Sequence, residues 1–220
     1  MIRLLVLDVD GTMTDGGVYY DSTGNELKKF AIKDGAGIVL AHAAGMQVMI
    51  CTGRECEAVR RRAQDLHIDY LFQNVHDKAA FLSRFMAEHS LTKQDVAYCG
   101  DDLNDLTAMA LCGFVACPAD AAGPVLGRAD FICRQKGGEG AVRGTVEEIL
   151  LRDGRLPAAV AIVGGALGIK PVLMLSEGAI HLVDKGRGRP GALVALYRQL
   201  DKQGGVDPAY GYTLVYSDDK

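Results

Sequence analysis

The chain has 220 residues and 49% of them are hydrophobic, so it is long enough to bury a core and form one domain, or one domain with a smaller appendage. A net charge of −4 argues against a nucleic-acid-binding protein, because such proteins usually carry a basic face. The acidity belongs to residues 1–150, which hold 15 Lys and Arg against 21 Asp and Glu. That balance suits a metal and phosphate site.

The six cysteines and the N-terminal segment favour a reducing compartment. The cysteines form no Cys-x-x-Cys pair, and three lie in apolar strand-like runs, so we expect buried free thiols. The first apolar run is interrupted by Arg3 and ends at Asp8, which is too short for a signal peptide or a membrane span. We therefore expect a cytoplasmic protein with no membrane partner.

Strand and helix patterns alternate along residues 1–152. An apolar run at 2–7 predicts a strand covered on both faces, and residues 18–32 alternate around a Ser-Thr-Gly-Asn turn, as in a β-hairpin. Asp34 is expected to cap the next helix, which Gly45 ends. Further strands are predicted at 46–52, 70–72, 95–99, 114–116 and 130–132, and further helices at 55–66, 78–89, 103–111 and 140–151. This alternation predicts an α/β fold with a doubly wound parallel sheet and a β-hairpin flap.

The pattern changes near Gly154, so we place a boundary between a domain at 1–152 and an appendage at 153–220. Residues 158–168 are almost wholly apolar, and residues 171–184 predict a hairpin turned at Glu177-Gly178. A helix is expected at 192–200 and a strand at 212–217. The appendage is therefore predicted to be a small α+β unit.

Four polar clusters follow predicted strands, where the ligand crevice of an open α/β sheet lies. They are Asp8-Val9-Asp10, Thr52-Gly53-Arg54, Lys78 at a helix start, and GDDLND at 100–105. Carboxylates from two strands can hold Mg²⁺, and a carboxylate can itself attack phosphorus. A hydroxyl and a lysine would stabilise the phosphoryl oxygens. An EF-hand loop counted from Asp8 fails, because its sixth residue is Met and its twelfth is Tyr.

The motifs DVDGTMTDG, FAIKDGAGI, CTGR, the lysine at 78, GDDLND and GGEGAVR occur in that order. With them, residues 1–150 resemble the haloacid dehalogenase superfamily of phosphatases, and within it the capless 3-deoxy-D-manno-octulosonate 8-phosphate phosphatases. The resemblance implies a Rossmann-like fold, a Mg²⁺ cofactor and an aspartyl-phosphate intermediate.

The resemblance also implies a role for each matching residue. Asp8 would be the nucleophile and a metal ligand, and Asp10 the general acid and base and a metal ligand through its backbone carbonyl. Thr52 and Lys78 would hold the phosphoryl oxygens, and Asp101 would complete the metal site. The remaining acidic and amide side chains would support that site, Asp102 by holding the metal through water or hydrogen bonds, and Asn104 and Asp105 by ordering the loop.

The implied substrate is a phosphorylated 3-deoxy-ulosonate sugar acid. Besides Thr52, the residues expected to line its pocket are Lys33, Asp34, Gly35, Arg54 and Glu55, with Lys33 standing where we expect an arginine. Glu55 keeps a nonulosonate 9-phosphate, of 2-keto-3-deoxynonulosonate or sialic acid, open as an alternative, and a phosphomutase would use the same site. The loops leave no room for a cap domain. The capless branch therefore implies a homotetramer whose hairpins partly cover neighbouring sites.

The appendage resembles a different family. Residues 154–193 look like the opening half of the second domain of DegV-type fatty-acid-binding proteins, with an IKP-x-L strand, a Glu-Gly turn and a Lys-x-Arg-Gly-Arg loop. The first domain, which holds the fatty-acid carboxylate in relatives, is absent. We therefore do not expect this tail to bind a fatty acid, and we favour a structural or interaction appendage. A non-enzymatic lipid- or partner-binding module remains an alternative function for the chain.

Overall fold

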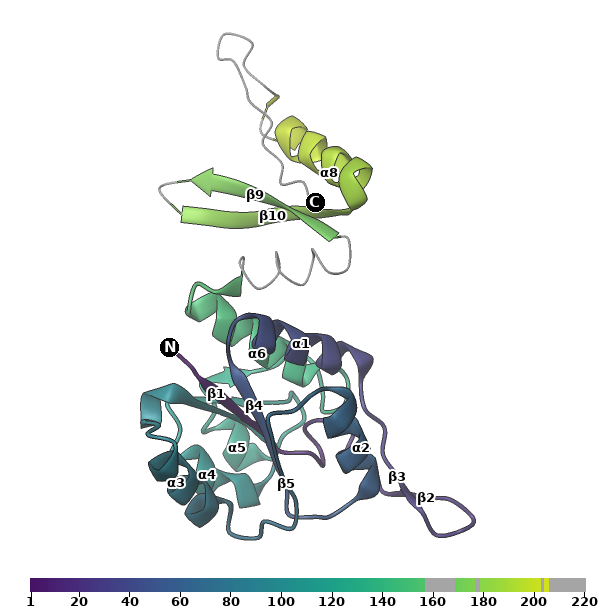
Figure 1. Cartoon of the computed structure of the whole chain (residues 1–220), viewed down its shortest axis with the longest axis vertical. Helices are drawn as coiled ribbons and strands as arrows, with labels where there is room; N and C mark the ends of the chain where they lie inside the picture. Colours follow the sequence, from purple (N-terminus) through teal and green to yellow (C-terminus); the bar gives the residue numbers. More distant parts are fainter. Residues whose placement is uncertain (157–168, 177–178, 203, 206–220) are drawn as a thin grey trace. The chain divides into compact units, whose positions relative to one another are not determined.

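The computed structural model describes residues 1–156, 169–176, 179–202 and 204–205, and the chain divides into two compact units, Met1–Val160 and Ala161–Lys220 (Figure 1). The first unit is built on a six-stranded sheet in the order β5-β4-β1-β6-β7-β8, with every neighbouring pair parallel. Its strands are β1 (Leu4–Leu7), β4 (Gln47–Cys51), β5 (Tyr70–Phe72), β6 (Val96–Cys99), β7 (Phe114–Cys117) and β8 (Phe131–Ile132).

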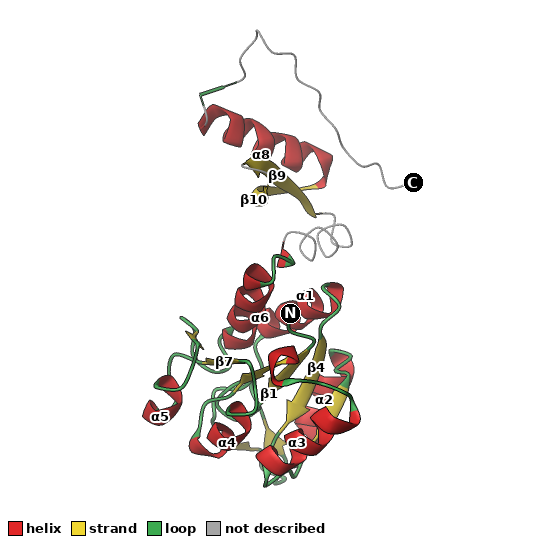
Figure 2. Cartoon of the chain, turned by 90° about the vertical axis from the view of Figure 1, so that its left-hand side faces the viewer, coloured by secondary structure: helices red, strands yellow, loops and turns green. Residues whose placement is uncertain are grey.

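Helices cover both faces of this sheet (Figure 2). They are α1 (Ile32–Ala43), α2 (Glu57–Asp65), α3 (Lys78–Glu88), α4 (Leu106–Met109), α5 (Gly123–Leu126) and α6 (Ala141–Arg152), with 3₁₀ turns at Lys93–Asp95 (η1) and Leu103–Asp105 (η2). Helices α1 and α6 pack together on one face, and α3 and α4 pack together on the other. The predicted doubly wound α/β fold is confirmed.

The strands are buried on both faces, as their apolar runs predict. Leu4 and Val6 of β1 join a cluster with side chains of α3, α4 and α5, while the alternating Leu5 and Leu7 are equally buried but lie outside that cluster. All six cysteines are buried and free, which confirms the prediction of core thiols.

Asp34 does not cap α1, so that prediction is wrong. The N-cap of α1 is Ala31, and Asp34 lies buried inside the helix. Its Oδ1 accepts a hydrogen bond of 2.9 Å from the backbone N–H of Arg143, in the first turn of α6. Burial raises the pKa of Asp34, although hydrogen bonds from the α6 amides act in the opposite direction. Asp34 therefore joins two helices far apart in the sequence.

We expect Asp34→Ala to lower the free energy of unfolding by about 1–2 kcal/mol, because the first amides of α6 lose their acceptor in a buried setting. Urea unfolding followed by circular dichroism measures this loss. Asp65→Ala is the matched control, since Asp65 forms an exposed ion pair with Arg61 and its removal should cost less than about 0.5 kcal/mol. Equal losses in the two variants would contradict the assigned role.

Two predicted elements differ in detail, and one helix was not predicted. The hairpin at 18–32 contains only two short strands, β2 (Tyr19–Tyr20) and β3 (Glu26–Leu27), and its last residue, Ile32, already belongs to α1. The helix expected at 103–111 is divided into η2 and α4, because Asp102 and Asp105 form a capping box that shapes the first turn. Helix α5 follows Pro118 and Asp120, and no pattern in the sequence predicted it.

The second unit contains the predicted hairpin. Strand β9 (Ile169–Ser176) pairs antiparallel with β10 (Ala179–Arg187), and α8 (Gly188–Lys202) packs on this pair. The Gln199 side chain donates to the Val183 carbonyl and to the Asp184 carboxylate, at 3.2 and 3.0 Å. The predicted turn at 177–178, the apolar segment at 158–168 and the strand at 212–217 lie outside the described residues. Among the helices that the structure describes, none has the length and apolarity needed to span a membrane.

Candidate active site

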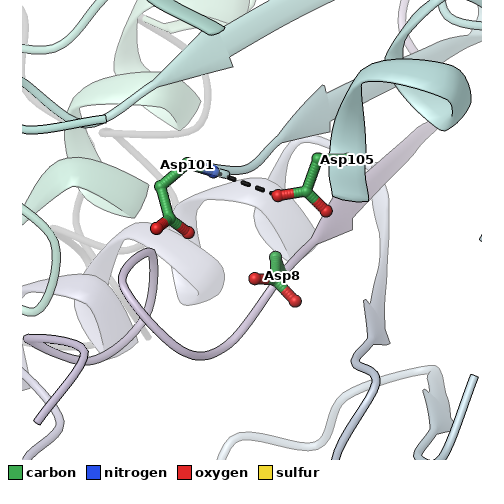
Figure 3. Close-up of side chains that lie close together, drawn as sticks. All are labelled: Asp8, Asp101 and Asp105. Atoms are coloured by element: carbon green, nitrogen blue, oxygen red, sulfur yellow. Dashed lines mark hydrogen bonds between the residues drawn. The ribbon is translucent and has the colours of Figure 1, made fainter. Parts of the chain in front are cut away.

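Three carboxylates meet at the carboxyl ends of neighbouring strands. Asp8 follows β1 and Asp101 follows β6, and the register of these strands places Leu7 opposite Cys99. Asp105 ends η2, which returns the loop toward β6. One oxygen of each carboxylate lies within 4.8 Å of the other two (Figure 3). The structure thus brings together three residues that lie up to 97 positions apart.

Asp105 is fully engaged as an acceptor. Its Oδ1 accepts hydrogen bonds from Lys78 Nζ and from the Tyr98 hydroxyl, at 2.7 and 2.8 Å. Its Oδ2 accepts from the backbone N–H groups of Asp101 and Asp102, at 3.1 and 3.4 Å. Because a carboxylate offers about four lone-pair sites, Asp105 orders the loop and holds Lys78 and is poorly suited to bind a metal.

Lys78 places a buried cation between two acids. It is the first residue of α3, its side chain is 1% exposed, and Nζ lies 2.7 Å from Asp8 Oδ1 and 2.7 Å from Asp105 Oδ1. The Asp77 side chain caps α3 by accepting from the Ala80 N–H, which fixes where the helix begins. Lys78 is therefore positioned by a local cap and by two ion pairs at once.

Two acids of the site, Asp8 and Asp101, have raised pKa values. The pKa of Asp8 is raised from 3.8 to about 7, first by burial and then by the charge of Asp105, whereas Lys78 acts to lower it. Burial also raises the pKa of Asp101 to about 6, against the hydrogen bond from Thr12. Three carboxylates beside one ammonium leave uncompensated negative charge, which a bound cation would offset.

The donors of this site fit Mg²⁺. Mg²⁺ takes oxygen ligands in proteins, and one or two carboxylates usually hold it together with water and substrate. The carboxylates of Asp8 and Asp101 offer such oxygens, and the Thr12 hydroxyl fixes Asp101 by donating to its Oδ1 at 2.8 Å. Asp8 and Asp101 are the side chains that would hold the ion.

Gly11 leaves the space that Asp101 occupies. Its φ is +87°, and a Cβ at this position would lie 2.1 Å from Asp101 Oδ2. We expect Gly11→Ala to displace Asp101 and to lower metal-dependent activity at least tenfold, because both the clash and the left-handed backbone oppose a side chain. Gly24→Ala is the matched control, since Gly24 has φ +88° with open space around its Cβ position. Metal titrations and kinetics of the two variants would refute this role if they were indistinguishable.

The Asp10 side chain points to the flap, which is the ribbon formed by β2 and β3, and it does not join the carboxylate cluster. The Asp10 side chain pairs with Nζ of Lys28, the residue that follows β3. The same Nζ lies 2.9 Å from Glu26 Oε1. Glu26 Oε2 in turn lies 2.9 Å from Arg54 Nη2. Burial lowers the pKa of Lys28, but its bonds with Asp10 and Glu26 raise that pKa by more. A continuous chain of charges therefore runs from Asp10 through the flap to Arg54.

Thr52 and Arg54 follow β4, the neighbour of β1. Thr52 is buried, and its Oγ1 accepts a hydrogen bond of 3.5 Å from the Arg54 N–H. Glu55 is exposed and pairs with Arg60, and both residues line a hollow of about 370 Å³ beside β5. Asp102 is exposed and caps η2 through the Leu103 N–H, and Asn104 is exposed in the same turn.

Two predicted substrate-binding residues of α1 lie against other helices. Asp34 binds the start of α6, and a Cβ on Gly35 would lie 3.0 Å from atoms of Arg62 and Leu66 in and after α2. That packing accounts for both residues without a ligand. Lys33, in contrast, is exposed in the first turn of α1.

Four residues of this network were not found from the sequence: Thr12, Glu26, Lys28 and Tyr98. Thr12 lies two residues after Asp10, and that position is the signal that could have identified it. Tyr98 lies in an apolar strand, where the pattern predicts an ordinary core residue. Glu26 and Lys28 lie in an alternating hairpin, where the pattern predicts solvent-exposed side chains. Their roles depend on contacts that only the folded chain creates.

Comparisons with known proteins find similarity to two different families. A family model described as "Uncharacterised protein, DegV family" matches residues 146–219. The chain is 40% identical over 158 residues to the 3-deoxy-D-manno-octulosonate 8-phosphate phosphatase KdsC of Escherichia coli K12, covering 72% of this chain and 84% of that protein.

Solved structures of phosphatases and hydrolases are also similar to this chain. The 3-deoxy-D-manno-octulosonate 8-phosphate phosphatase of Moraxella catarrhalis, in complex with magnesium ion, phosphate ion and KDO, aligns with a TM-score of 0.71 and 34% identity, over 74% of this chain and 93% of that one. A Legionella pneumophila structure described as a HAD superfamily (subfamily III A) hydrolase aligns with a TM-score of 0.71 and 35% identity, over 75% and 90%. The chain therefore belongs to the 3-deoxy-D-manno-octulosonate 8-phosphate phosphatase family of the haloacid dehalogenase superfamily, and it is a phosphoric monoester hydrolase.

Proposed function

We propose that this chain hydrolyses a phosphorylated 3-deoxy-ulosonate of the 3-deoxy-D-manno-octulosonate 8-phosphate class, with Mg²⁺ as cofactor and an aspartyl-phosphate intermediate on Asp8. The observation that carries the proposal is the position of Asp8, with Lys78 at 2.7 Å and Asp101 in the same carboxylate cluster. An oxygen nucleophile, a buried cation and a metal-binding carboxylate at one sheet edge are the parts that phosphoryl transfer requires.

Each step is assigned to side chains of this chain. Asp8 attacks phosphorus while the bond to the leaving sugar oxygen breaks, and Asp10 gives its proton to that oxygen. Asp10 then takes a proton from the water that attacks the phosphorylated Asp8, which releases phosphate and restores the free carboxylate. Lys78 and Thr52 stabilise the phosphoryl oxygens. A bound Mg²⁺ would neutralise charge on the same oxygens.

The sugar acid would be recognised beside Thr52. Arg54 follows Thr52 on the same loop, and its guanidinium suits the carboxylate of an ulosonate. Lys33 is exposed and offers a second cation without the bidentate geometry of arginine. Glu55, which is exposed and paired with Arg60, stays a proposed contact with the sugar. Asp34 and Gly35 would support the pocket through helix packing.

We also propose that the protein forms a homotetramer through its flap. The flap and its junction with α1 expose Tyr20, Leu27 and Ile32, which are 66%, 51% and 87% accessible. Apolar side chains gathered on one small ribbon favour association with another protein surface. Light scattering coupled to size-exclusion chromatography tests this assembly, and a monomer at micromolar concentration would contradict it.

The substrate proposal is tested by a panel of phosphate esters. Phosphate release is measured from 3-deoxy-D-manno-octulosonate 8-phosphate, a nonulosonate 9-phosphate and glucose 6-phosphate, with Mg²⁺ or with EDTA. We expect the highest kcat/KM for the octulosonate ester and no turnover in EDTA. A higher kcat/KM for the nonulosonate ester, or turnover that is unchanged in EDTA, would overturn the assignment.

A further inference from the structure

The side chain of Lys28 is buried although it lies on a surface flap. The flap between β2 and β3 is fixed at its tip by the Asp21 carboxylate, which accepts from Thr23 and Asn25 at distances of 2.7 to 2.9 Å. Lys28 follows the second strand of this ribbon, and its side chain is 1% exposed. A lysine is almost never buried unless it is paired, and here two carboxylates pair with it.

The two partners of Lys28 come from different places. Asp10 belongs to the loop after β1, where the proposed chemistry occurs, and Glu26 belongs to the flap itself. The second oxygen of Glu26 holds Arg54 on the loop after β4. Glu26, itself held by Arg54, therefore fixes the position of the Lys28 ammonium. From that position the ammonium makes its other ion pair with Asp10.

We propose that Lys28 is a positioning residue that acts through Asp10. Its ammonium holds the Asp10 side chain in one orientation. As the Asp10 proton passes to the leaving oxygen, negative charge develops on the Asp10 carboxylate, and the nearby ammonium stabilises that charge. This inference rests on the proposed function, because it needs Asp10 to be the proton donor.

A different result is expected if Lys28 only holds the flap in place and does not act through Asp10. Loss of the flap as a water barrier would affect both esters, and loss of the Glu26 contact with Arg54 would weaken binding of the sugar ester even in a variant that already lacks Asp10. Loss of proton donation matters for a sugar alkoxide and matters little for p-nitrophenolate, which leaves without a proton. The dependence of kcat/KM on the leaving group, combined with the effect of the Lys28 variant in the Asp10→Asn background, therefore separates the two roles, because kcat/KM reports transfer to Asp8.

The experiment compares Lys28→Met, Asp10→Asn and the double variant, on 3-deoxy-D-manno-octulosonate 8-phosphate and on p-nitrophenyl phosphate. We expect Lys28→Met to lower kcat/KM at least roughly tenfold on the sugar ester and less than about threefold on the aryl ester. In the Asp10→Asn background, Lys28→Met should have almost no further effect, because the group through which it acts is absent. Lys28→Arg should restore part of the loss.

Lys29→Met is the matched control, because the neighbouring Lys29 has a side chain that is 58% exposed and lies 3.6 Å from Asp15. Thermal unfolding checks that every variant is folded. Equal losses on both esters, or additive losses in the double variant, would overturn the role of Lys28 and leave the proposed function intact. If Asp10→Asn itself shows no preference for the aryl ester, the assignment of Asp10 fails, and the inference fails with it.

Discussion

Asp8→Asn is expected to lower phosphate release at least roughly a thousandfold on every phosphate ester that the protein hydrolyses. The amide cannot attack phosphorus, and it also removes a negative charge from the cluster with Asp101 that would hold the metal. Steady-state kinetics on the sugar ester and on p-nitrophenyl phosphate measure the effect. Because the aryl ester needs no proton donor, a loss on both esters identifies the attacking group.

The fold of this variant is expected to survive. The amide relieves the charge repulsion with Asp105, whose proximity raises the pKa of Asp8, and it keeps an oxygen that accepts from Lys78. Asp15→Asn is a suitable control, since Asp15 is also an acid of this loop and pairs with Tyr19 and Lys29 at the surface. Substantial turnover by Asp8→Asn, comparable with that of Asp15→Asn, would rule out Asp8 as the nucleophile.

Lys78→Met is expected to remove most activity and to lower the free energy of unfolding by about 3 kcal/mol at pH 8 in the absence of metal. The variant leaves Asp8 and Asp105 buried without their shared cation. The loss should shrink at pH 5.5, because Asp8, whose pKa is already raised to about 7, can then take a proton and become neutral in the folded state. Urea unfolding at the two pH values measures both effects.

The sign of this pH dependence is fixed by the raised pKa. An acid whose pKa is higher in the folded state than in the unfolded state favours folding more as the pH falls from about 7 toward 4. Removing Lys78 raises the pKa of Asp8 further, because Lys78 acts to lower it, and strengthens this trend. Lys29→Met provides the exposed comparison. A penalty that is the same at both pH values would show that Lys78 acts through packing and not through charge.

The sheet could be predicted from the sequence because its determinants are local. Each strand is an apolar run followed by a turn, and parallel strands bring their carboxyl ends to one edge whatever the packing details are. Asp8 and Asp101 were therefore placed correctly at that edge before any contact was known. The family motifs added roles that the spacing of acids alone does not supply.

The contacts that depend on tertiary packing could not be predicted. Asp34 reads as a cap for α1 because acids are favoured there, yet it reaches α6, which begins 107 positions later. Lys28 lies in an alternating ribbon in which a lysine is normally solvated, and its burial follows from where the flap folds. Short elements such as α5 carry too few residues for a periodic pattern.

The central claim, that Asp8 is phosphorylated during turnover, is tested most directly by a burst experiment on the Asp10→Asn variant. With p-nitrophenyl phosphate, transfer to Asp8 needs no proton donor, but release of phosphate needs Asp10 as base, so the intermediate should accumulate. The account predicts a burst of one p-nitrophenolate per active site, together with borohydride-reducible acyl phosphate at Asp8 by mass spectrometry. Linear release from the first turnover, with no label at Asp8, would contradict it.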